Sequence, residues 1–189
     1  MPNKTDIINI ALLLAGEEEI ADLDDTSKPA TTAKVFWDLC LESLISRADW
    51  SWAVSLVTLA PDTTPPEFGY TQRFLLPDDF NHIVINIIED PEEEEFDFRI
   101  FGEYLHFSGD SLELKYCSNI TNVINMGPMA AEALSYLLAS KIASALSSSP
   151  EKPNAYFESL YNGRLALAIV QDPVAMGITY NTTAWSDTR

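Results

Sequence analysis

The sequence contains few of the side chains that usually carry out chemistry. Two histidines and two cysteines occur among 189 residues, and neither type has the spacing of a zinc site or of a disulfide framework. The seven glycines form no phosphate-binding loop and no nucleophile elbow. We therefore expect no catalytic site, no metal ion and no other cofactor. Cys40 and Cys117 are predicted to be small buried apolar side chains.

Positive charge is also scarce, because 11 lysines and arginines accompany 29 acidic residues and the formal net charge is −18. Residues 61–122 hold 14 acids and only 3 bases. This charge excludes ordinary binding of nucleic acid through a basic patch. The sequence also lacks an apolar run of bilayer length and an N-terminal basic region followed by an apolar one. We therefore expect a soluble protein that is not secreted and contacts no membrane.

Four segments have helical periodicity. A short apolar helix from Asp6 to Ala15 is predicted to end at Gly16, and two further helices are predicted over 128–148 and 154–170. The longest helix is predicted from Thr26 to Asp49, with two adjacent apolar rows too wide for a surface helix. We therefore expect this helix at the centre of a bundle. Its rows are Phe36, Cys40, Leu44 and Ala48, and Trp37, Leu41 and Ile45.

Between these helices the apolar period changes to two, which predicts antiparallel strands. The first strand is predicted to begin directly at Trp50, and others cover 68–74, 82–88, a hairpin over 96–107 about Gly102, and 112–117. The predicted fold class is α+β, a helical bundle with an inserted antiparallel β section and an extended C-terminal tail. Its expected parts are residues 1–49 and 125–171 for the bundle, 50–124 for the β section and 172–189 for the tail.

Two acidic clusters are the remaining candidates for chemistry. Asp78 and Asp79 suit an acid/base pair, but adjacent acids after a proline are typical turn formers. The run Glu92, Glu93, Glu94 and Glu95 lacks the alternating ligands of a calcium loop and is interpreted as a solvated charge run. His82 and His106 are expected to be sheet residues without a catalytic role.

Several motifs, taken together, resemble the head-to-tail adaptor proteins of tailed phages, the tail tubular protein A family. The likeness covers about Asp6 to Asp172 and the extreme C-terminus. Five motifs follow one another in the order and spacing of that family. They are an opening helix that ends in glycine, a long helix that leads into an insertion, and a strand that ends in leucine-proline-x-aspartate. A third long helix and a tryptophan-to-arginine ending follow. The corresponding residues are Asn9–Gly16, Trp50–Ala53, Tyr70 through Leu76–Asp79, Ala131–Leu134 with Leu137–Ala143, and Ala184–Arg189.

The resemblance implies a virion protein of the phage neck, assembled in the host cytoplasm as a ring of twelve copies between portal and tail nozzle. DNA would pass through this ring without specific binding. The first helix and the helix after Pro128 are expected to offer apolar surface to neighbouring subunits. The C-terminal tail is expected to dock on the portal or on a neighbouring subunit through Met176, Ile178, Tyr180, Trp185 and Arg189. Glu92 to Glu95 are candidates for a channel-facing or nozzle-facing acidic group.

Other classes of function stay open at this stage. An acidic mimic of DNA would also be strongly negative, although its carboxylates should be regularly spaced and here they cluster in loops. Another phage protein-interaction module is a further possibility. A hydrolase would have to use Asp78, Asp79 and His82.

Overall fold

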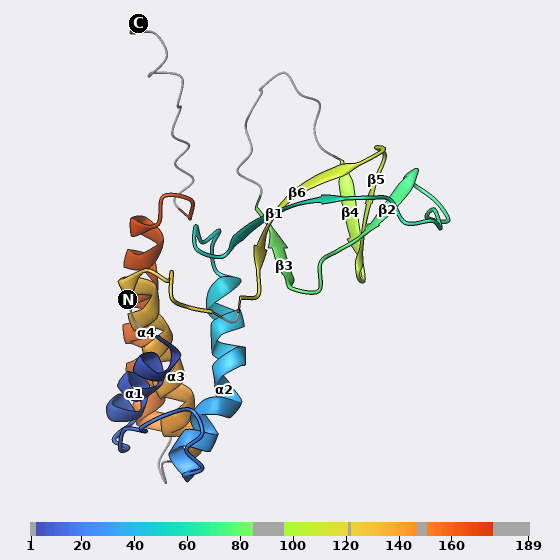
Figure 1. The fold of residues 1–189 in the computed structure, drawn as a ribbon. Coiled ribbons are helices and arrows are strands. Elements are labelled where there is room, and N and C mark those ends of the chain that lie inside the picture. Colours follow the sequence, from blue (N-terminus) through green and yellow to red (C-terminus); the bar gives the residue numbers. More distant parts are fainter. Residues whose placement is uncertain (1–2, 85–96, 121, 147–150, 176–189) are drawn as a thin grey trace, which may run out of the picture. The chain divides into compact units, whose positions relative to one another are not determined.

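The computed structural model describes residues 3–84, 97–120, 122–146 and 151–175, with 151–154 described by backbone alone (Figure 1). The chain forms two compact units. Residues 1–52 and 120–189 make the helical unit, and residues 53–119 make the β unit. The described residues contain four helices and two small antiparallel sheets. The predicted α+β class is therefore confirmed.

Two helices of the helical unit, α1 and α2, begin directly after a capping residue. α1 (Lys4–Ala15) follows Asn3, whose side chain accepts from the Asp6 backbone N–H while the Asp6 side chain accepts from the Asn3 N–H. This reciprocal capping satisfies two donors at the helix start. Gly16 ends α1 with a φ of 83°, a left-handed conformation that glycine adopts without strain. α2 (Lys28–Ile45) is capped by Ser27 and has a proline in its first turn.

The centre of the helical unit is α3 (Pro128–Leu146), not α2. α3 packs against α1, α2 and α4 (Glu151–Gln171), as Figure 1 shows. Its alanines and serines allow close approach on several sides, most of its apolar positions are buried within the chain, and none of its large apolar side chains is among the exposed ones. The prediction that α3 offers apolar surface to other subunits is therefore wrong. In α2 the two predicted rows are largely buried, but Val35 and Leu39 remain 70% and 58% exposed.

The junction after α2 also differs from the prediction. α2 ends at Ile45 rather than Asp49, and β1 (Val54–Leu59) begins well after Trp50. Trp50 lies in the intervening turn, fully buried, and its indole N–H donates to the Leu44 carbonyl at 2.9 Å. The alternation of large apolar and smaller residues that begins at Trp50 has the period of a β-strand. Trp50 instead returns to the end of α2, where its indole is a second donor to the Leu44 carbonyl, which also accepts from the Arg47 N–H at 3.1 Å.

The β unit contains two three-stranded sheets. One has the order β1-β6-β3, where β3 is Phe80–Ile83 and β6 is Leu112–Ser118. The other has the order β2-β5-β4, and β2 is only Gln72–Leu75 rather than the longer predicted strand. β4 (Phe98–Phe101) and β5 (Tyr104–Phe107) form the predicted hairpin, with Gly102 at a φ of 62° in its turn. The predicted strand at 82–88 coincides with β3 only at its start, and residues 85–88 lie outside the described residues.

The β unit has a hydrophobic core of its own. Phe74 and Leu105, from paired strands, are both fully buried, and they pack with residues of β6. The core therefore joins the two sheets. Its buried members are Phe74, Leu76, Leu105, Leu112, Leu114 and Tyr116.

Candidate functional site

Two groups of predicted site residues lie outside the described residues. The docking tail, with Met176, Ile178, Tyr180, Trp185 and Arg189, falls within 176–189. The acidic group, with Glu92, Glu93, Glu94 and Glu95, falls within 85–96. Both assignments stay predictions from the sequence.

The Asp78–Asp79 pair lies in the turn before β3. Asp79 accepts a hydrogen bond from the Tyr116 hydroxyl at 2.9 Å, and its backbone carbonyl accepts from the Asn119 N–H. Burial, together with the neighbouring Asp79 carboxylate, raises the pKa of Tyr116, so the phenol keeps the proton that it donates. Asp78 is exposed. Asp79 thus anchors the turn to β6, which is a structural contact.

Both histidines belong to strands, as predicted. His82 lies in β3, where its Nδ1 is 2.7 Å from the Asn81 side-chain oxygen. His106 lies in β5, and its ring packs edge-on against Phe101 and Tyr70, with centroid distances of 5.1 and 6.4 Å. The two side chains therefore belong to different sheets.

The helical unit contains a hollow of about 220 Å³, which we call the Asp172 hollow. Three segments form it: the turn after α2, the start of α3 and the end of α4. Most of its walls are apolar, and the polar groups are few. The lining residues are Trp50, Ser51, Trp52, Asn125, Gly127, Pro128, Met129, Ala130, Ala168, Gln171, Asp172 and Pro173.

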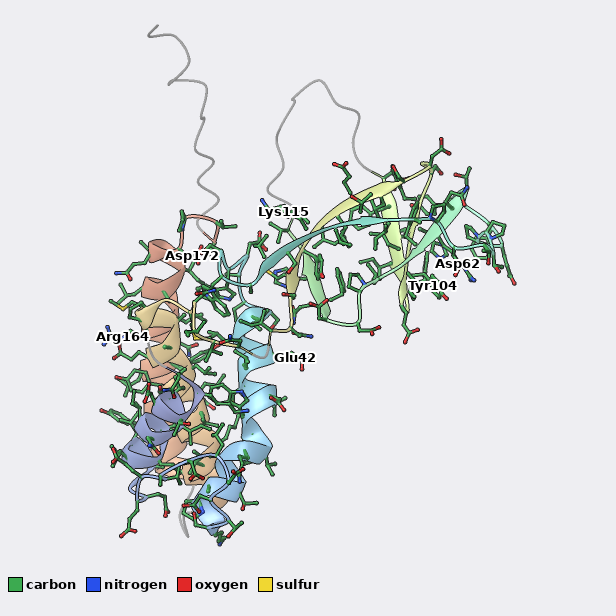
Figure 2. The ribbon with its side chains drawn as sticks, in the orientation of Figure 1. Glu42, Asp62, Tyr104, Lys115, Arg164 and Asp172 are labelled. Atoms are coloured by element: carbon green, nitrogen blue, oxygen red, sulfur yellow. The ribbon has the colours of Figure 1, made fainter. Side chains whose placement is uncertain are left out.

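Asp172 closes one side of the hollow, directly after the last residue of α4 (Figure 2). Its side chain is buried and accepts from the Ser51 hydroxyl at 2.8 Å and from the Ser51 N–H at 3.1 and 3.2 Å. The same carboxylate accepts from the N–H groups of Val174 and Ala175 at 3.0 and 3.2 Å. One side chain thus fastens the end of α4 to the turn after α2 and sets the path of the chain as far as Ala175.

Trp50 and Trp52 supply the aromatic wall. Their rings stack with centroids 5.5 Å apart. Trp50 is held by its hydrogen bond to Leu44 and is fully buried, whereas Trp52 is half-buried. A rigid ring therefore supports a second ring that is partly accessible from the hollow.

The hollow suits binding of a side chain better than it suits catalysis. Both Asp172 carboxylate oxygens already accept several hydrogen bonds. Sites for drug-sized molecules usually have volumes of about 300 Å³ or more, and this hollow is smaller. An aromatic or aliphatic side chain matches both the volume and the walls.

This hollow was not predicted from the sequence. Asp172 served only as a boundary of the tail, and Ser51 had no assigned role. The signal in the sequence was an aspartate followed by proline at the end of a helix, which is a common way to end a helix and to satisfy nearby N–H groups. Only the fold brings this aspartate to a residue 121 positions away.

Replacing Asp172 with alanine is expected to destabilise the helical unit by about 2–3 kcal/mol, because hydrogen bonds to a carboxylate contribute more than neutral ones. The matched variant Ser51→Ala removes only the hydroxyl and should cost about 0.5–1.5 kcal/mol. Urea unfolding followed by tryptophan fluorescence measures both. A smaller decrease in the free energy of unfolding for the Asp172 variant than for the Ser51 variant would contradict the assigned role of the carboxylate.

A second surface of the helical unit is the outer side of α1. Ile7, Ile8, Ala11 and Leu12 are buried, while the opposite side of the same helix exposes further apolar residues. We call these exposed residues the α1 face: Ile10, Leu13 and Leu14, with exposed fractions of 44%, 55% and 37%. No helix in the described ranges is both long and apolar enough to cross a lipid bilayer.

Comparison with known protein families gave no matching family model. Comparison with curated proteins likewise gave no match.

Proposed function

We propose that this chain is a structural protein of a phage virion, a head-to-tail adaptor that assembles as a ring between portal and tail nozzle. The proposal rests on the resemblance of the sequence motifs and on the surface of the helical unit. Its partners are further copies of itself, twelve in a ring, together with the portal and nozzle proteins. The expected location is the neck of the virion.

The observation that carries most weight is the α1 face. α1 is apolar on nearly all sides, yet it packs mainly on α3, with a smaller contact to α2, and leaves its opposite side exposed. A helix that is hydrophobic all round usually lies inside a protein or an assembly. Val35 and Leu39 form a second exposed apolar pair, on α2. Contacts between subunits would bury such side chains, as oligomer interfaces do.

The acidic excess of the β unit supports a role in which the protein lies near DNA but does not bind it. Residues 53–119 contain 14 acids and 3 bases. Such a charge, repeated around a ring, repels phosphates and lets a duplex pass without adhesion. Carboxylates that face away from the channel of the assembled ring would refute this part of the proposal.

The test is a pull-down and sizing experiment with the portal ring from the same source. The full chain should assemble on the portal, and Leu13→Glu should prevent ring formation because it places a charge in the centre of a subunit contact. Leu56→Glu is the matched control, since Leu56 is an exposed leucine of the β unit at 78%. This control should assemble like the unmodified chain.

A chain that ends at Ala175 tests the tail separately. It keeps every hydrogen bond to Asp172 described above but lacks residues 176–189. Failure of this shorter chain to bind the portal is the expected result. If the full chain does not bind, the adaptor proposal falls, and competition with DNA-binding proteins then tests the alternative of a DNA mimic.

A further inference from the structure

We propose that the Asp172 hollow is an intramolecular docking site for the chain's own C-terminal segment, residues 176–189. In the chain that has not yet assembled, the hollow takes the side chain of Tyr180 against the Trp50–Trp52 pair. This proposal concerns the single chain alone and does not depend on the adaptor function.

The described part of the chain ends beside the hollow. Asp172 and Pro173 line the hollow, and the next two residues are fixed beside it because their N–H groups donate to the Asp172 carboxylate. The segment that follows therefore starts at the edge of the hollow. A tether of a few residues gives a high effective concentration, so docking needs no large interface.

The hollow matches one aromatic side chain in volume and in the residues that line it. The hollow is too small for most drug-sized ligands but has an aromatic wall of which Trp52 is the accessible part. Aromatic rings prefer offset or edge-on contact with each other. The exposed residues Asn125 and Gln171, which also line the hollow, carry amides that can bond a phenol hydroxyl.

The side chain of Tyr180 lies close enough along the chain to reach the hollow. Tyr180 is five residues beyond Ala175, a span of at most about 16–18 Å when extended. Gly177 lies between them, and glycine permits the turn that returns a chain toward its origin. Trp185 is the other aromatic residue of the segment, but it lies twice as far along the chain. The shorter path selects Tyr180.

The test uses the full chain, labelled with ¹⁵N and with ¹³C methionine methyl groups, in the absence of a portal. Nuclear Overhauser effects are expected between the Tyr180 ring and the Met129 methyl group. Tyr180→Ala should remove them, shift the Trp52 indole N–H resonance and increase its hydrogen exchange at least tenfold. The matched variant Trp185→Ala should leave the Trp52 and Met129 signals unchanged. The buried Trp37 indole serves as an internal reference.

Three results would overturn the proposal. Unchanged Trp52 and Met129 signals in Tyr180→Ala would show that Tyr180 does not occupy the hollow. A shift caused by Trp185→Ala alone would identify the other ring as the occupant. Signals that change on dilution would assign the occupant to a second copy of the chain.

Discussion

Replacing Phe74 with alanine is expected to destabilise the β unit by about 3–5 kcal/mol while the helices stay folded. Phe74 is fully buried in the core that joins the two sheets. Such truncations cost about 3–5 kcal/mol through lost burial and the cavity left behind. A unit that spans residues 53–119 has a stability of roughly 3–10 kcal/mol at about 0.05–0.15 kcal/mol per residue. The substitution therefore removes much of the stability of this unit.

The distribution of tryptophan makes this result measurable. All four tryptophans, at positions 37, 50, 52 and 185, lie outside residues 53–119. Tryptophan fluorescence therefore reports the helical unit, and hydrogen exchange of the β6 amides reports the β unit. Phe101→Ala is the matched control, because Phe101 is 56% exposed. A single transition seen by both probes in the Phe74 variant would mean that the two units unfold together.

Replacing Trp50 with alanine is expected to destabilise the helical unit by about 3–5 kcal/mol. The change removes a fully buried indole and its stack with Trp52, and leaves the Leu44 carbonyl without the indole donor. Trp50→Phe separates these contributions. It keeps an aromatic ring and loses the N–H, so about 0.5–1.5 kcal/mol is expected from the lost hydrogen bond, because the Leu44 carbonyl still accepts from the Arg47 N–H at 3.1 Å.

Urea unfolding followed by circular dichroism measures both Trp50 variants, since their fluorescence differs from that of the unmodified chain. An alanine variant no less stable than the phenylalanine variant would show that the burial of this side chain contributes little. The role given to Trp50 as support for the Asp172 hollow would then be wrong.

Local signals in the sequence predicted local structure well. Gly16 ends α1 as predicted, and the predicted helix starts at Asp6 and Thr26 lie two residues from the observed starts at Lys4 and Lys28. Gly102 and the alternation around it predicted the β4–β5 hairpin. In each case the deciding interaction joins residues a few positions apart, so a short window of sequence contains it.

The errors arose where tertiary contacts overrule local pattern. Alternating aromatic residues favour a strand at Trp50, but the indole gains more by burial at the end of α2. The apolar rows of α2 suggested a central helix, whereas the small residues of α3 allow neighbours to pack on more of its sides. The Asp172 hollow joins three segments from distant parts of the sequence, which periodicity alone cannot bring together.

The arrangement of the helical unit has a consequence for synthesis of the chain. This unit is built from both ends of the sequence, and α1 and α2 rest on α3 rather than mainly on each other. On the ribosome, α1 and α2 emerge before their main packing partner exists, while residues 53–119 can already complete both sheets. The insertion is therefore able to fold first. Closure of the helical core waits for synthesis of α3 and α4, which supply the packing surface for α1 and α2.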